Sequence, residues 1–162
     1  LNDCIEIIHD RCGIHHPDTD AVLPKRIADT VQQAGKGQAD ILVAFEMMEA
    51  MRWLEYLKPG GKIVVNDYRI PSGPILIGAC DYPEQVIEKL KEKADTTVIQ
   101  AGEIAKQIGN PRTMNLVLFG ALVKGMNLTA IDFETEIAAN VKPETLPLNL
   151  EAFRAGIAAL GK

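Results

Sequence analysis

Polar side chains follow each of the strands that the sequence predicts. Glu46 follows the apolar run ILVAF (41–45), Asn66 and Asp67 follow the run KIVV, and residues 101–103 follow the run TTVIQ. In an open parallel sheet, ligands bind beyond the carboxyl ends of the strands, because loops and helix N-termini converge there. Glu46 could therefore accept hydrogen bonds from a ribose or an amine. Alternatively, Glu46 caps the helix that it opens, since a helix N-terminus favours a carboxylate.

A second polar group stands at the start of the most apolar predicted helix, residues 113–126. Asparagine and arginine side chains at a helix N-terminus could hold an anion. They could equally cap the helix and bridge to a partner protein. No residue is predicted to be catalytic, and the residues that we expect to face a ligand or an interface are Glu46, Asn66, Asn110, Arg112 and Asn115.

Other motifs of catalysis and metal binding are absent from the sequence, which contains no G-x-G-x-x-G, Walker A or G-x-S-x-G segment. The Gly-Asp-Gly of thiamine diphosphate enzymes is also absent. His15 and His16 could bind a metal, but no third ligand is near them, so we interpret them as loop residues. A [4Fe–4S] cluster needs four thiolates, and Cys4, Cys12 and Cys80 supply three. We expect them to be free thiols in a reducing compartment.

Strands and helices alternate along the chain. The apolar runs at 41–45, 62–66 and 96–101 have the composition of parallel strands that are covered on both faces. Amphipathic segments separate these runs, and two more, TAIDFETEIAANV and LNLEAFRAGIAAL, lie near the end of the chain. The pattern predicts an α/β fold: a three-layer, Rossmann-like domain with a mostly parallel sheet and C-terminal helices. Helices are also predicted at residues 2–12, 24–35, 45–57, 83–94 and 102–109.

The segment LKPGG precedes the second strand. We predict that Lys-Pro-Gly-Gly turns the chain, with a positive φ at Gly60 or Gly61. This turn lies at the end of the sheet opposite the ligand edge, so its glycines do not hold phosphate. After the strand, residues 70–83 contain three prolines and two glycines among apolar residues, and we predict an extended, irregular excursion.

Composition excludes several classes of function. Seventeen basic and twenty-two acidic side chains give a net charge of −5, which argues against a nucleic-acid partner. No apolar run approaches the ~18 residues that span a bilayer, and the start LNDCIEIIHDRC lacks the basic region of a secretory signal. We therefore expect a cytoplasmic protein. Because the chain begins with Leu, we also expect the natural N-terminus to be missing.

One part of the chain resembles the later half of a class I S-adenosylmethionine-dependent methyltransferase. The resemblance rests on ADILVAF followed by LEYLKPGGKIVVND. It implies a nucleotide-binding domain acting alone, but residues 1–40 lack that family's acidic-x-Gly-x-Gly cofactor loop. A domain that only binds other proteins is a further alternative.

A second resemblance covers roughly residues 38–160. ADILVAFE with LKPGG forms its first block, GNPRTMNLVLFGAL (109–122) its second, and PLNLEAFRAGIAAL follows in the same order. These segments resemble the gamma-type subunit or domain of 2-oxoacid:ferredoxin oxidoreductases, and within that family the beta subunit of indolepyruvate oxidoreductases. The family's opening Gly-x-Gly-Gly-Gln-Gly loop is absent. We therefore assign residues 38–162 to the gamma-type domain and leave 1–37 unassigned.

The resemblance implies oxidative decarboxylation of a 2-oxoacid to its acyl-CoA, with electrons passed to ferredoxin. Thiamine diphosphate, Mg and [4Fe–4S] clusters would sit on a partner subunit, coenzyme A would be a co-substrate, and this chain would hold none of them alone. Isolated chains could self-associate. The candidate docking surfaces are the 113–126 helix and the side chains of Met47, Met48, Met51 and Trp53, for which the alternative is ordinary core.

Overall fold

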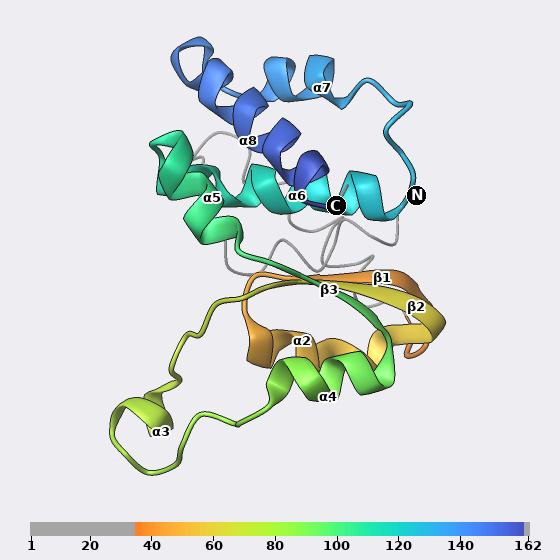
Figure 1. The fold of residues 1–162 in the computed structure, drawn as a ribbon, viewed down its shortest axis with the longest axis vertical. Helices are drawn as coiled ribbons and strands as arrows, with labels where there is room; N and C mark the ends of the chain where they lie inside the picture. Colours follow the sequence, from red (N-terminus) through yellow and green to blue (C-terminus); the bar gives the residue numbers. More distant parts are fainter. Residues whose placement is uncertain (1–34, 161–162) are drawn as a thin grey trace, which may run out of the picture.

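Three parallel strands form the sheet at the centre of the computed structural model, which describes residues 35–160 (Figure 1). The strands are β1 (Ala39–Ala44), β2 (Leu57–Asn66) and β3 (Asp95–Ile99), in the order β1-β2-β3. Both pairings are parallel. The α/β fold with a parallel sheet, predicted from the apolar runs, is confirmed.

Helices cover both faces of this sheet (Figure 1). On one face, α2 (Met47–Trp53) and α4 (Val86–Lys93) pack against Leu42, Ile63 and Val65. On the other face, α5 (Ala101–Ile108) and α6 (Met114–Gly125) pack against Ile41 and Val64. Successive residues of a strand point to opposite faces, so strands covered twice need apolar residues at every position. This requirement explains the unbroken apolar runs.

The helix α6 is buried between the sheet and α8 (Leu146–Ala159) (Figure 1). Glycines allow the two helices to touch backbone to backbone: a Cβ on Gly120 would lie 2.0 Å from the Phe153 oxygen. A Cβ on Gly156 would lie 1.9 Å from the Val117 oxygen. α7 (Phe133–Asn140) packs on the far side of this pair, where Val123, Ile137 and Phe153 form a small core. The predicted C-terminal helices are thereby confirmed.

The predicted turn at Lys-Pro-Gly-Gly is wrong, because these residues lie inside β2. Ala39 pairs with Leu57 and Ile41 pairs with Lys62, so β2 advances five residues while β1 advances two. The surplus residues form a bulge, where Pro59 lacks the N–H that a regular ladder would require. The predicted positive φ is confirmed at Gly60, with φ 78°.

Several predicted boundaries shift by a few residues. α4 begins at Val86 and not at Pro83, because Gln85 has a left-handed backbone with φ 57°. β3 ends at Ile99, and Ala101 already belongs to α5. Three short 3-10 helices adjoin the α-helices. η3 (Leu54–Tyr56) follows α2, η4 (Pro111–Thr113) precedes α6, and η5 (Pro143–Thr145) precedes α8.

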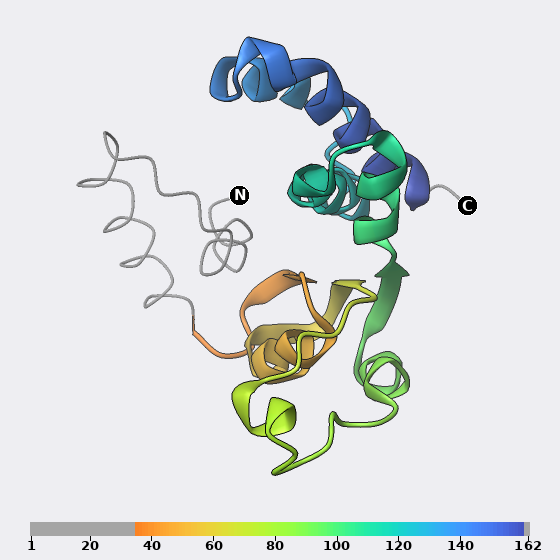
Figure 2. The same ribbon diagram turned by 90° about the vertical axis from the view of Figure 1, so that its left-hand side faces the viewer.

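The excursion after β2 is an arm, residues 67–85, that projects from the carboxyl edge of the sheet (Figures 1 and 2). The arm is irregular except for the single turn of α3 (Gly73–Leu76), which lies near the middle of this segment along the chain. The irregular excursion predicted for residues 70–83 is confirmed with that addition. Cys80 in the arm is an exposed free thiol.

The predictions for residues 1–34 lie outside the described residues, including both early helices, two cysteines and the histidine pair. Within residues 35–160, no helix is long and apolar enough to cross a bilayer.

The glycine contacts between α6 and α8 predict a large loss of stability in Gly156→Ala. The new methyl group collides with backbone that cannot move alone, so we expect the free energy of unfolding to fall by about 3 kcal/mol. Urea unfolding of the full chain measures the change. Gly73→Ala is the matched control, because a Cβ on Gly73 meets nothing within 4 Å. It should change the free energy by less than about 0.5 kcal/mol; equal effects of both variants would contradict the close packing.

Candidate functional site

The structure places the polar residues that follow the three strands at one edge of the sheet, as predicted. Asn66 is the last residue of β2, and its side chain bridges the chain segments that follow β1 and β3. Its Nδ2 donates to the Phe45 carbonyl oxygen at 3.1 Å, and its Oδ1 accepts from the Ala101 N–H at 2.9 Å. Nδ2 also lies 3.4 Å from the sulfur of Met114, the first residue of α6.

Asn66 is 1% exposed, so these contacts replace the hydrogen bonds that it would make to water. One carboxamide thereby joins the carboxyl ends of β1 and β3 to the start of α6. This geometry gives Asn66 a structural task, and the ligand contact expected of it stays a prediction.

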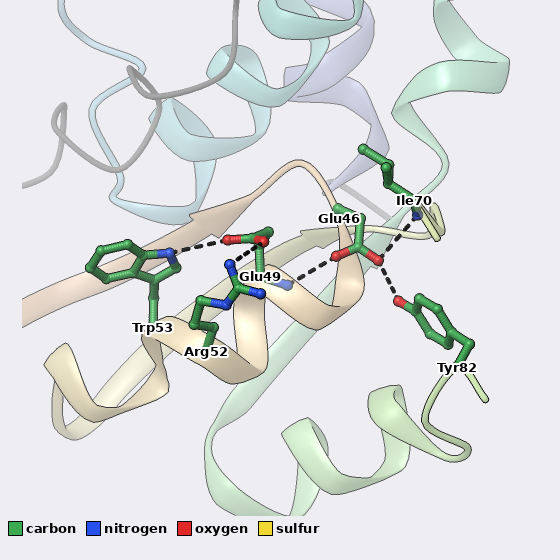
Figure 3. Close-up of polar contacts among 6 residues, drawn as sticks. All are labelled: Glu46, Glu49, Arg52, Trp53, Ile70 and Tyr82. Atoms are coloured by element: carbon green, nitrogen blue, oxygen red, sulfur yellow. Dashed lines mark hydrogen bonds and ion pairs between the residues drawn. The ribbon is translucent and has the colours of Figure 1, made fainter. Parts of the chain in front are cut away.

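Glu46 caps α2, as the alternative interpretation held. Its Oε2 accepts from the Glu49 N–H at 3.0 Å, while the carboxylate is only 3% exposed (Figure 3). The other oxygen, Oε1, accepts from the Ile70 N–H at 3.3 Å and from the Tyr82 hydroxyl. A buried carboxylate needs several donors, and Glu46 obtains them from α2 and from both ends of the arm.

The sequence analysis missed Tyr82 as the partner of Glu46. Burial and the hydrogen bond to the Glu46 carboxylate raise the pKa of Tyr82 well above its ordinary value. The guanidinium of Arg69 lies over the Tyr82 ring, 5.1 Å from its centroid. Glu46 and Tyr82 stand 36 positions apart in the sequence, so no local pattern could have revealed their contact.

Glu49 extends this polar chain along α2. It accepts from the Trp53 indole N–H at 3.3 Å and pairs with Arg52 at 3.0 Å (Figure 3). These contacts keep the polar atoms of Trp53 and Arg52 satisfied on one side of the helix.

A shallow pocket of about 330 Å³ lies beside this network, between the arm and α4. Arg69 and Lys91 supply positive charge to its wall, and Asp67 and Glu88 supply negative charge. The mixed wall does not select for either an anion or a cation.

The second polar group lies at η4 and the start of α6. Asn110 accepts from the Arg112 N–H at 3.0 Å and so caps η4. The hydroxyl of Thr113, which is buried, donates to the backbone carbonyl oxygen of Asn110 at 2.8 Å. Arg112 is exposed, and the buried Oδ1 of Asn115 has no hydrogen-bond partner among the described residues. Asn110 therefore caps η4 and not α6 as predicted, because Thr113 is the N-cap of α6 and makes no side-chain cap bond. Arg112 and Asn115 retain groups that could bind elsewhere.

Most of the predicted docking residues belong to the core, as the alternative interpretation held, whereas Met48 is half-buried and its docking role stays a prediction. Met47 is 3% exposed, and Met51 and Trp53 pack on the same apolar cluster between α2, α4 and the sheet. In α6, the side chains from Val117 to Val123 are mostly buried under α8. Helical spacing shows which residues share a face, but it does not tell whether that face meets the sheet or a partner.

Among residues 35–160, no three His, Cys, Asp or Glu side chains come close enough together to hold a metal ion.

Comparison with known proteins shows that the chain is similar to subunits of oxidoreductases. The family model of pyruvate ferredoxin/flavodoxin oxidoreductase matches residues 23–159. The chain is 33% identical over 130 residues to indolepyruvate oxidoreductase subunit IorB of Pyrococcus horikoshii, which covers 76% of the chain and 64% of that protein. It is 32% identical over 132 residues to subunit IorB of Thermococcus kodakarensis, with the same coverage. The chain thus spans slightly less than two thirds of these relatives.

Two solved structures share the fold. The gamma subunit of a keto/oxoacid ferredoxin oxidoreductase from Geobacter sulfurreducens superposes with a TM-score of 0.55 at 24% identity, over 78% of this chain and 67% of that one. The 2-oxoglutarate:ferredoxin oxidoreductase of Magnetococcus marinus, with 2-oxoglutarate, coenzyme A and succinyl-CoA bound, gives 0.57 at 22% identity. That match covers 78% of this chain and 20% of the other.

The buried carboxylate of Glu46 predicts a measurable cost for Tyr82→Phe. The change removes one donor from Glu46 and leaves the ring in place, so we expect the free energy of unfolding to fall by about 1–2 kcal/mol in urea. Tyr68→Phe is the same chemical change on a ring that is 52% exposed, and it should be nearly neutral. A Tyr82→Phe variant as stable as the parent would show that Glu46 does not depend on this hydroxyl.

Proposed function

Because the chain belongs to the pyruvate ferredoxin/flavodoxin oxidoreductase family, we propose that it is the gamma-type subunit of a 2-oxoacid:ferredoxin oxidoreductase of the indolepyruvate type. The complex would convert a 2-oxoacid and coenzyme A to the acyl-CoA and carbon dioxide. The electrons released would pass to ferredoxin. In this proposal the chain works only within the complex and supplies no catalytic residue.

The observation that carries the proposal is the family match over residues 23–159, together with about one-third identity to two IorB subunits. The methyltransferase resemblance rests on a single block, and the comparisons favour the oxidoreductase over it. Since the chain spans 64% of those relatives, the activity of the whole complex remains part of the proposal.

The redox and carbanion chemistry is assigned to a partner subunit. Thiamine diphosphate with Mg would form the carbanion there, and [4Fe–4S] clusters would carry the electrons. A cluster needs about four thiolates. Residues 35–160 contain a single cysteine, Cys80. Ferredoxin would meet that partner and contact this chain indirectly, if at all. We place the complex in the cytoplasm.

The chain's own polar groups would position parts of this assembly. Glu46 and Asn66 fix the carboxyl edge of the sheet through their buried hydrogen bonds. Arg112 and Asn115 stand with Asn110 at the start of α6, where an exposed guanidinium could meet an anion such as a phosphate of coenzyme A. The other role for these three residues is to bridge to the partner subunit. Arg112→Ala in the assembled complex separates the two, because the first role predicts a raised KM for coenzyme A and the second predicts weaker assembly.

Anaerobic co-production of this chain with the thiamine diphosphate-binding subunit from the same genome tests the proposed function. We expect a brown complex that reduces ferredoxin when indolepyruvate and coenzyme A are both present. This chain alone and the larger subunit alone are the controls, and pyruvate and 2-oxoglutarate test the choice of 2-oxoacid. The proposal fails if the two chains do not associate, or if this chain alone oxidises the substrate. Calorimetry with S-adenosylmethionine tests the methyltransferase alternative directly.

A further inference from the structure

The tip of the arm, residues 70–80, carries apolar side chains into solvent. Leu76 is 72% exposed and Ile77 is 81% exposed. They are the most exposed of the large hydrophobic side chains in the described part of the chain. The eleven residues of the tip contain no charged side chain, although the chain as a whole is 24% charged. Exposed, uncharged apolar surface of this kind marks contact sites.

The tip has a defined shape of its own. The Leu76 N–H donates to the Ser72 oxygen at 2.9 Å, and the Ala79 N–H donates to the Pro74 oxygen at 2.9 Å. Pro71 and Pro74 further restrict the backbone that leads to Leu76. Two neighbouring aliphatic side chains are therefore presented on a turn that is already formed, which lowers the entropy lost on binding.

The base of the arm is fastened to the sheet at both ends. On the outgoing side, the backbone carbonyl oxygen of Tyr68 accepts from the Met47 N–H at 3.2 Å, and the Ile70 N–H donates to Glu46 at 3.3 Å. On the returning side, the Tyr82 hydroxyl donates to the same Glu46 carboxylate (Figure 3). One buried side chain thus fixes the direction in which the tip points (Figures 1 and 2).

We propose that the tip of the arm is the element that docks this chain onto the thiamine diphosphate-binding subunit, with Leu76 and Ile77 inserted into an apolar groove of that partner. The inference rests on the proposed function and names the surface through which that complex forms. Aliphatic anchors in a pocket are a usual centre of protein interfaces.

A second copy of this chain fits the tip less well. Two tips meeting each other would contribute eleven residues each, whereas a stable interface needs about 20–30 residues a side. Each copy also carries a net charge of −5, so two copies repel each other outside the contact. A groove on a different and larger subunit can surround the tip and adds contacts elsewhere.

The test measures the affinity of the full chain for the purified partner subunit by biolayer interferometry. Leu76→Asp and Ile77→Asp place a charge at the tip, and each should weaken binding about 30-fold. Ile131→Asp is the matched control: Ile131 is 45% exposed and precedes α7, so the same change there should alter binding less than about twofold. Both tip side chains are solvent-exposed, and circular dichroism and urea unfolding should show all three variants folded like the parent.

The outcomes separate the two proposals. If the parent chain does not bind the partner, the proposed function fails and this inference fails with it. If the parent binds and the tip variants bind equally well, or if Ile131→Asp weakens binding as much, the docking role of the tip is overturned while the proposed function stands. The role is also overturned if sedimentation shows a dimer of this chain that Ile77→Asp dissociates while partner binding is unchanged.

Discussion

The carboxamide of Asn66 connects the chain segments at the carboxyl edge of the sheet. It satisfies one backbone group beyond β1 and one at the start of α5, and it touches the sulfur of Met114 at the start of α6. An apolar residue here would leave the Phe45 oxygen and the Ala101 N–H buried without partners, at a cost of about 1–3 kcal/mol each. The helix layer formed by α5 and α6 is therefore positioned relative to the sheet by a single polar side chain inside it.

Glu46 extends the same constraint outward. A carboxylate that is 3% exposed is tolerated because Glu49, Ile70 and Tyr82 all donate to it. Two of these donors belong to the arm, so the charge that caps α2 also determines where the arm leaves the sheet. The carboxylate of Glu46 in this way connects α2 to the arm.

The sequence predicted the layered sheet because burial on both faces leaves a strong local mark in ILVAF and KIVV. It failed at Lys-Pro-Gly-Gly, since a bulge and a turn require the same residues and only the pairing with Ala39 and Ile41 distinguishes them. The cap formed by Glu46 was accessible because it is local, with its donor three residues away. The bond to Tyr82 and the inward direction of Asn66 were not, because tertiary packing decides them.

The touching backbones of α6 and α8 limit how this protein can move. Where Gly120 meets Phe153 and Gly156 meets Val117, the two backbones are in direct contact, and no side chain separates them. If α6 shifted along α8 by even one residue, a Cβ would collide with a carbonyl oxygen. The two helices therefore behave as one rigid unit. A conformational change in any complex that this chain joins must then move α6 and α8 together or leave both in place.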